Sequence, residues 1–162
     1  VCTATRTGAL AALLSDFSGG FDDGYDIMAG CIAVAESITT VDFTRDGIIS
    51  GVDMKKCKEM YPAFYFSENY SLLGDKNTAE TKYEKGWFIP TLAELSKICR
   101  NKIKLNDSLL RLDASHQLFD DYWSASQYYD GSPWIVNFDF ASIDNEVGEN
   151  DFPKVLVVHY LE

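Results

Sequence analysis

Four apolar residues in the middle of the chain recur at the spacing that places side chains on one face of a helix: Leu92, Leu95, Ile98 and Cys99. Thr91 stands directly before this run, and Glu94 lies three residues after Thr91. In such a pair, a capping box, each side chain accepts a hydrogen bond from the backbone N–H of the other residue. We therefore expect a helix from residue 92 to about residue 100, separated by Pro90 from a short strand at residues 87–89.

Other segments before residue 120 have helical or loop character. Residues 55–70 are predicted to be helical, with Pro62 near a helix start or at a kink. A further helix is expected to begin at Asn106 and to reach about residue 114. The apolar residues 27–37 fit either a strand or the start of a buried helix, and residues 16–26 are predicted to form a Gly- and Asp-rich loop.

After residue 120 the pattern changes to short β segments. Residues 122–128, 134–140 and 155–160 are rich in aromatic and β-branched side chains. Alternation in the second segment predicts two opposite sets of side chains: Trp134, Val136 and Phe138 toward the core, and Ile135, Asn137 and Asp139 away from it. The connections at 129–133 and 141–153 are rich in Gly, Asp, Asn and Ser and are expected to be loops. Together these elements predict an α+β fold.

Composition narrows the class of protein. The chain has 162 residues, of which 46% are hydrophobic, so it is expected to bury one core and to form one domain over residues 1–160. The net charge is −11, and residues 112–153 contain nine acidic residues and no Lys or Arg. Such a stretch repels phosphate groups, which argues against nucleic acid and anionic membranes as partners. The apolar run at 27–34 is too short to span a bilayer, so we expect no membrane insertion by this domain.

Candidate catalytic chemistry is sparse. The only histidines are His116 and His159, and no nucleophile elbow, metalloprotease helix, P-loop or dinucleotide fingerprint is present. The loop aspartates at 22 and 23 lack the remaining ligands of an EF-hand. We therefore expect no catalytic residue, no metal and no cofactor. Of the four cysteines, Cys57 and Cys99 are expected to be buried thiols, and a disulfide between Cys2 and Cys31 is left open.

Four motifs in order resemble a known family. Residues 86–95 (GWFIPTLAEL) are similar to the G-W-x-[LIM]-P-[ST]-x-x-E-L signature of the DUF1566 (Lcl C-terminal) family. Residues 122–126 (YWSAS), 134–138 (WIVNF) and 155–159 (VLVVH) resemble later motifs of that family, and the match covers about residues 57–160. The resemblance implies a C-type lectin-like fold in its formylglycine-generating-enzyme version, with helices flanking a small twisted antiparallel sheet and long surface loops that display a binding surface.

Two departures from that resemblance bear on function. Formylglycine-generating enzymes use cysteines in the later part of the fold, whereas no cysteine follows Cys99 here. Calcium-dependent lectins carry E-P-N or Q-P-D and W-N-D triplets, which this chain lacks. The resemblance thus favours a protein that is not an enzyme. A constant carbohydrate- or protein-binding adhesin domain and a formylglycine-generating-type oxidising enzyme stay open as alternatives.

The vocabulary of residues 128–153 is restricted. Apart from Trp134, Glu146 and Glu149, every residue can be encoded by changing adenines in an Asn codon of the form AAY, and Lys, Met and Gln do not occur. This bias resembles the variable proteins of diversity-generating retroelements, which carry their variable residues near the C-terminus of a C-type lectin fold. Ordinary loop composition is the alternative explanation. Exposed aromatic and acidic side chains together suit a paratope-like surface, and we expect twelve residues to line it: Tyr129, Asp130, Ser132, Ile135, Asp139, Phe140, Asp144, Asn145, Val147, Asn150, Asp151 and Phe152.

These interpretations set the expected context of the protein. The ligand is expected to be a protein or another macromolecule, and the domain is expected to be a monomer. The chain begins at Val1 instead of Met, which leaves room for a removed leader and for a lipid-anchored location at the cell surface or outside the cell. Residues 161–162 resemble the remnant of a tag.

Overall fold

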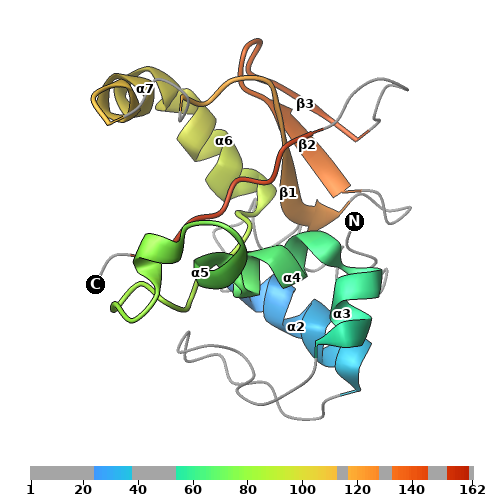
Figure 1. Cartoon of the computed structure of the whole chain (residues 1–162). Helices are drawn as coiled ribbons and strands as arrows, with labels where there is room; N and C mark the ends of the chain where they lie inside the picture. Colours follow the sequence, from blue (N-terminus) through green and yellow to red (C-terminus); the bar gives the residue numbers. More distant parts are fainter. Residues whose placement is uncertain (1–23, 38–53, 113–116, 128–132, 146–152, 161–162) are drawn as a thin grey trace.

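The computed structural model describes residues 24–37, 54–112, 117–127, 133–145 and 153–160. The fold is α+β (Figure 1). The helices are α2 (Gly24–Glu36), α3 (Lys55–Met60), α4 (Pro62–Glu68), α5 (Tyr70–Leu73), the 3-10 helix η1 (Lys76–Thr78), α6 (Leu92–Arg100) and α7 (Lys102–Leu110). The strands are β1 (Asp121–Gln127), β2 (Pro133–Asn137) and β3 (Ser142–Asp144).

The three strands form one antiparallel sheet in the order β1-β2-β3. β2 is central, and the pairing of β1 with β2 shifts register between Trp123 and Gln127. The segment 153–160 passes along the other edge of β1, because Lys154 and Tyr122 form an isolated bridge. A second bridge joins Phe88 to Val158. The strands expected at 87–89 and 155–160 are therefore reduced, within the described residues, to the one bridge that joins them, Phe88 with Val158.

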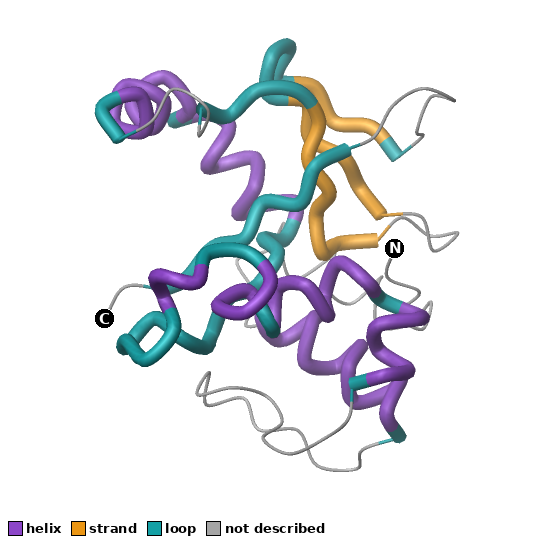
Figure 2. The backbone as a smooth tube through the Cα atoms, in the orientation of Figure 1, coloured by secondary structure: helices purple, strands orange, loops and turns teal. Residues whose placement is uncertain are grey.

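Two apolar clusters lie on either side of the sheet region. The first joins α2, α3 and α4 to Phe88, Ile89 and Ala125, and the second joins α6 to Tyr122, Val136 and Phe138. Figure 2 shows the corresponding arrangement, with α2 to α5 gathered below the sheet and α6 running beside it. The predicted inward positions Val136 and Phe138 are confirmed, and Trp134 packs partly buried at the edge of the second cluster.

Residues 27–37 are largely helical, which settles the alternative left open by the sequence. α2 begins at Gly24, so the last three residues of the expected loop 16–26 belong to the helix, and residues 16–23 lie outside the described part. A Cβ added at Gly24 would lie 2.0 Å from the carbonyl oxygen of Ile89. Glycine is therefore required where the start of α2 crosses this segment.

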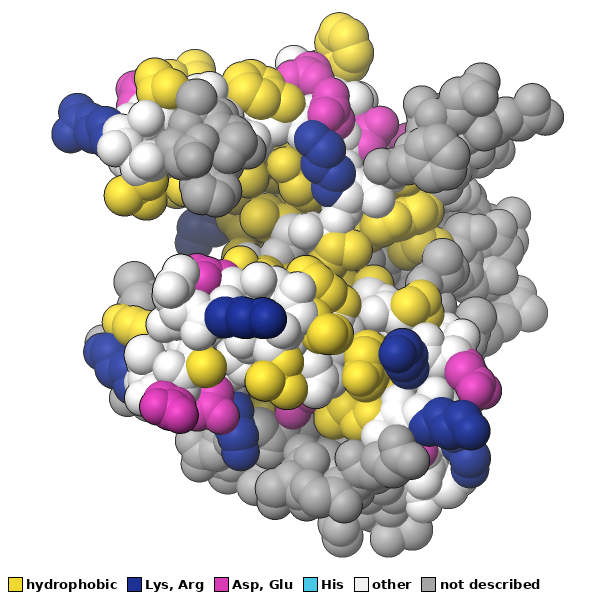
Figure 3. Space-filling view, in the orientation of Figure 1, with side chains coloured by type: hydrophobic (Ala, Val, Ile, Leu, Met, Phe, Trp, Pro, Cys, Tyr) yellow, Lys and Arg dark blue, Asp and Glu magenta, His cyan; other side chains and the backbone are white. Residues whose placement is uncertain are grey.

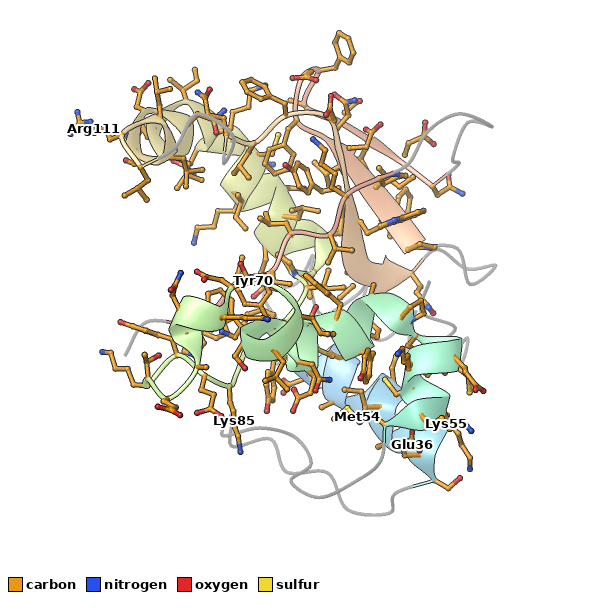
Figure 4. The ribbon with its side chains drawn as sticks, viewed as in Figure 1. Glu36, Met54, Lys55, Tyr70, Lys85 and Arg111 are labelled. Carbon is orange, nitrogen blue, oxygen red and sulfur yellow. The ribbon has the colours of Figure 1, made fainter. Side chains whose placement is uncertain are left out.

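The predicted helical stretch 55–70 is divided into three short helices. Pro62 occupies the first turn of α4, where its missing N–H costs no hydrogen bond, as the sequence predicts. The side chain of Glu36, at the end of α2, accepts a hydrogen bond of 2.6 Å from the backbone N–H of Cys57. Figure 4 shows Glu36 beside Met54 and Lys55 at this junction. The end of one helix thus caps the start of the next.

Asn106 does not begin a helix, contrary to the expectation. It lies inside α7, is buried, and its side chain bonds both backbone groups of Leu118: the amide donates to the carbonyl at 3.1 Å, and the amide oxygen accepts from the N–H at 2.7 Å. An asparagine near a helical pattern suits either a cap or such a long-range bridge, and only the tertiary structure decides between them.

The capping box of α6 is confirmed and has wider connections. Glu94 Oε2 accepts hydrogen bonds from the backbone N–H and the hydroxyl of Thr91, each at 2.9 Å, and from the backbone N–H of Gly24 at 3.1 Å. Its Oε1 accepts from the hydroxyl of Tyr160 at 2.6 Å. One carboxylate thus connects the starts of two helices and the segment 153–160.

Gln127 is expected to cost the fold stability. Its side chain is 1% exposed, and neither amide atom has a hydrogen-bond partner in the part of the chain that the structure describes. A buried polar group without partners carries a desolvation penalty of about 1–3 kcal/mol. Gln127→Met, which keeps the length of the side chain, should raise the free energy of unfolding in urea by about 1–2 kcal/mol.

The matched control for Gln127 is Gln117→Met, at a half-buried position outside the sheet. This change should leave stability within about 0.5 kcal/mol. A loss of stability in Gln127→Met would show that the amide makes hydrogen bonds in solution.

None of the helices in the described part of the chain has the length and apolar character needed to cross a bilayer. Cys57 and Cys99 are buried thiols, as expected, and Cys31 is buried as well. Cys2, the partner considered for Cys31, lies outside the described residues.

Candidate functional site

The described part of the expected binding region is the hairpin formed by β2 and β3. Asn137 pairs with Ser142, Val136 with Ile143, and Ile135 with Asp144, so residues 138–141 form the turn. Ala141 closes this turn with φ 53°, in the left-handed region. The sequence predicted a loop over 141–153, so β3 is an addition to the predicted sheet.

The base of the turn is fixed by buried and backbone contacts. Phe138 is fully buried, and its ring centroid lies 4.8 Å from that of Tyr122. Its backbone N–H donates to the carbonyl of Asp120 at 2.8 Å. Its carbonyl accepts from the ammonium group of Lys102, which comes from the start of α7. These contacts set the path of the chain into the turn without using the side chains that follow.

The end of the turn projects into solvent. Phe140 is 83% exposed, and its backbone N–H donates to the side-chain oxygen of Asn137 at 2.7 Å. Asp139, also exposed, accepts a hydrogen bond of 3.1 Å from the backbone N–H of Asp120. Ile143 on β3 is 48% exposed. Figure 3 shows acidic side chains beside a projecting hydrophobic one at this end of the molecule.

Charges at the base of the hairpin alternate in sign. Lys154 and Asp120 form an exposed ion pair of 2.7 Å. The hydrogen bond that the Lys154 ammonium group donates to the Asp120 carboxylate raises the pKa of Lys154 above its usual value. Burial raises the pKa of the neighbouring Tyr122 hydroxyl, the charge on Lys154 opposing it. The surface around the turn therefore offers carboxylates with nearby ammonium groups, a pattern suited to polar protein surfaces.

The structure exposes most of the described residues expected at the site. Asp139, Phe140 and Asp144 are exposed, and Asn145 is half-buried, with its N–H donating to Asp144 Oδ1 at 2.7 Å. Ile135 was expected to be exposed. That prediction is wrong, because the residue is only 3% exposed. It sits on the central strand between its partners Trp123 and Asp144, which flank it on the same face.

Seven other predicted site residues lie outside the described residues: Tyr129, Asp130, Ser132, Val147, Asn150, Asp151 and Phe152. Sequence reasoning also missed Ile143, which the structure exposes beside the turn. The missing signal was the register of β2 with β3, since Ile143 stands opposite the buried Val136 at the open edge of the sheet.

The remaining reactive groups are engaged in the fold. His159 Nε2 lies 2.8 Å from the carbonyl oxygen of Lys85, and its Nδ1 contacts the carbonyl of Tyr160. Its ring meets those of Tyr83 and Trp87 edge-on. Burial raises the pKa of the Cys99 thiol, an effect that Lys102 and Arg100 oppose. His116 lies outside the described residues.

Among the described residues, no three His, Cys, Asp or Glu side chains lie close enough together to hold a metal ion. Comparison with known proteins returned no matching protein-family model, no matching curated protein and no matching solved structure. The motif resemblance therefore stays a prediction.

Proposed function

We propose that this protein is a binding protein that recognises a macromolecular ligand, most simply another protein, through the β2–β3 hairpin and the flanking residues of the 128–153 region. One observation carries the proposal. Phe140 is 83% exposed, two residues after the fully buried Phe138 and beside the exposed Asp139. A large aromatic side chain held in solvent next to carboxylates is unfavourable in isolation and is typical of a recognition surface.

The construction of the turn supports variation at this surface. Asn137, Asp120 and Lys102 hold the turn through backbone groups of Phe138 and Phe140. Replacement of the Phe140 side chain therefore leaves these hydrogen bonds in place. Such a scaffold suits the variable protein of a diversity-generating retroelement, in which exposed side chains change and the backbone does not.

The proposed fold is C-type lectin-like. The residues of the DUF1566-like motif have structural roles that a shared fold would require. Gly86 is buried with φ 87°, Thr91 and Glu94 form the cap of α6, and the carbonyl of Pro90 accepts a hydrogen bond of 2.8 Å from the N–H of Ala125. The motif thus joins α6 to β1, the element that precedes the proposed binding region. These structural roles of the motif residues support the resemblance.

Two alternatives to a variable binding protein make different demands on the structure. A constant adhesin domain of this fold would use the hairpin for one fixed ligand. A formylglycine-generating-type enzyme would need a reactive cysteine in an open site, whereas the three cysteines in the described part of the chain are buried. The observations favour binding over oxidation, and we further propose that the protein acts at the cell surface or outside the cell.

Flanking DNA tests the variable-protein proposal directly. We expect a reverse-transcriptase gene nearby, together with a near-identical repeat of the region encoding residues 128–153 that differs from it only at adenines. A repeat with differences at all four bases, or none at all, would return the protein to the class of constant adhesins.

A pair of libraries tests the binding surface itself. Randomising Asp139, Phe140 and Asp144 should leave most displayed variants folded, because these three side chains are exposed. A control library at the buried positions Tyr122, Val136 and Phe138 should be mostly unfolded. Selection of the first library on an unrelated protein such as lysozyme should yield binders. Equal loss of folded variants in both libraries would contradict the proposal.

A further inference from the structure

A cavity of about 400 Å³ lies between α4 and the sheet, away from the turn at 138–141. The described residues in its walls come from five parts of the chain and are mostly aromatic or aliphatic: Tyr61, Pro62, Ala63, Phe64, Phe66, Ile89, Trp123, Ser124, Pro133 and Val155. Figure 3 shows hydrophobic side chains gathered in the hollow between the helical part and the sheet. The volume is in the range of small-molecule sites, which are about 300–1,000 Å³.

The β1 wall of this cavity carries two polar side chains. Trp123 and Ser124 are consecutive residues of β1 that both border it, at the point where the register of β1 with β2 shifts. Register irregularities in strands re-aim side chains and are frequent next to binding sites. Without the shift, neighbouring strand residues would point to opposite faces. The wall therefore presents two hydrogen-bonding side chains where a regular strand would present one.

Both side chains retain hydrogen-bonding capacity. The Ser124 hydroxyl donates to the carbonyl of Ser126 at 3.1 Å, which leaves its lone pairs able to accept. The indole N–H of Trp123 has no acceptor among the residues that the structure describes. An indole N–H is a donor only, and that of the half-buried Trp123 is not among the enclosed polar atoms without a partner in the described residues, so a ligand can reach it. The site thus offers one donor, from Trp123, and one acceptor, from Ser124.

The remaining wall selects against charge. None of the described residues that line the cavity is Lys, Arg, His, Asp or Glu. An ion entering it would lose water without gaining a partner of opposite charge from these residues. Size sets the other limit, because a cavity of about 150 Å³ holds benzene. The larger volume here suits a molecule of about two rings.

We propose that this cavity is a binding site for an uncharged aromatic small molecule of about two rings that carries a hydrogen-bond acceptor, such as a ketone. The rings pack between the aromatic side chains of α4 and Trp123, and the acceptor receives the indole N–H. Among the described residues, the cavity shares only Pro133 with the β2–β3 hairpin and lies away from the turn at 138–141, so failure of one proposal leaves the other standing.

The neutral two-ring dye prodan, which has a ketone, is a suitable probe. Protein added to prodan should shift its emission to the blue, with half-saturation at about 100 μM protein or below. The anionic dye 5-(dimethylamino)naphthalene-1-sulfonate, which shares the two rings and the dimethylamino group of prodan, should bind at least tenfold more weakly. Equal binding of both dyes would overturn the proposed selection against charge. Unchanged prodan emission at three times that protein concentration would overturn the site.

Two variants locate the dye. Ala63→Phe fills the cavity and should abolish the blue shift, whereas Leu72→Phe adds the same ring at an exposed position on α5 and should have no effect. Trp123→Phe keeps an aromatic wall but removes the donor, and should weaken prodan binding about threefold to tenfold. Thermal unfolding confirms that each variant is folded. Prodan binding that survives in a folded Ala63→Phe protein, or that is unchanged in Trp123→Phe, would assign the dye to another surface.

Discussion

Phe138→Ala should lower the free energy of unfolding by about 4 kcal/mol, whereas Phe140→Ala should change it by less than about 0.5 kcal/mol. The two phenylalanines are two residues apart and differ only in environment. Phe138 is fully buried in the α6 cluster against Tyr122, and its loss leaves a cavity that the sheet and helix cannot close. Phe140 is 83% exposed and loses little contact when truncated.

Urea unfolding followed by far-UV circular dichroism measures both values, and the unchanged slope of the transition serves as a check on two-state behaviour. Because both changes remove the same atoms, the difference between them reports burial alone. Similar losses in the two variants would mean that the turn at 138–141 packs against the protein in solution, which would also remove Phe140 from the proposed binding surface.

Glu94→Ala should cost about 3 kcal/mol of stability, which is large for a side chain that is only partly buried. The loss has three origins. The carboxylate half of the capping box of α6 is lost with the two bonds from Thr91, whereas the bond from the backbone N–H of residue 94 to the Thr91 hydroxyl remains. The N–H of Gly24 at the start of α2 loses its acceptor, and the hydroxyl of Tyr160 loses its bond. An ordinary capping residue acts on one helix only, where removal costs about 1 kcal/mol.

Three variants separate these contributions by thermal or urea unfolding. Glu59→Ala, at an exposed position of α3, should be neutral and gives the baseline for losing a carboxylate. Tyr160→Phe removes only the hydroxyl and should cost about 1 kcal/mol. Glu94→Gln keeps one accepting oxygen and should fall between the wild type and Glu94→Ala. A cost for Glu94→Ala no greater than that of a single cap would show that the links to α2 and Tyr160 do not contribute.

Local signals predicted the parts of the fold that local forces determine. The helix α6 follows from apolar spacing and from Thr91 and Glu94, and both its range and its capping box are confirmed. The inward positions Val136 and Phe138 follow from alternation within one strand. Pro62 at the start of α4 follows from its missing N–H. In each case the deciding interactions lie within a few residues along the chain.

Predictions failed where distant segments decide the outcome. Alternation marks Ile135 as facing away from the α6 cluster, but it cannot show that neighbours on both sides bury a residue of the central strand. The bridges of Lys154 and Val158 depend on segments about 30 and 70 residues away. The sequence predicted that a helix begins at Asn106, because nothing local shows that its side chain bonds the backbone of Leu118, twelve residues further along the chain.

The cavity is also beyond sequence reasoning. Tyr61, Phe64 and Trp123 are all residues that a sequence assigns to the core, and a space between them exists only because α4 and β1 meet at a particular distance. Exposure at the hairpin could be anticipated from composition. The cavity could not be anticipated in the same way, since its presence depends on the distance between α4 and β1.

The segment 153–160 belongs to both apolar clusters. Val155 and Val158 pack against the cluster of α2 to α4, and Leu156, between them, packs against the cluster of α6. Figure 1 shows this segment running from the sheet across to the helices. Neither half of the molecule can release it without exposing apolar surface of the other. The two halves should therefore unfold in a single cooperative transition, and ligand bound at either one would protect backbone amides in both from hydrogen exchange.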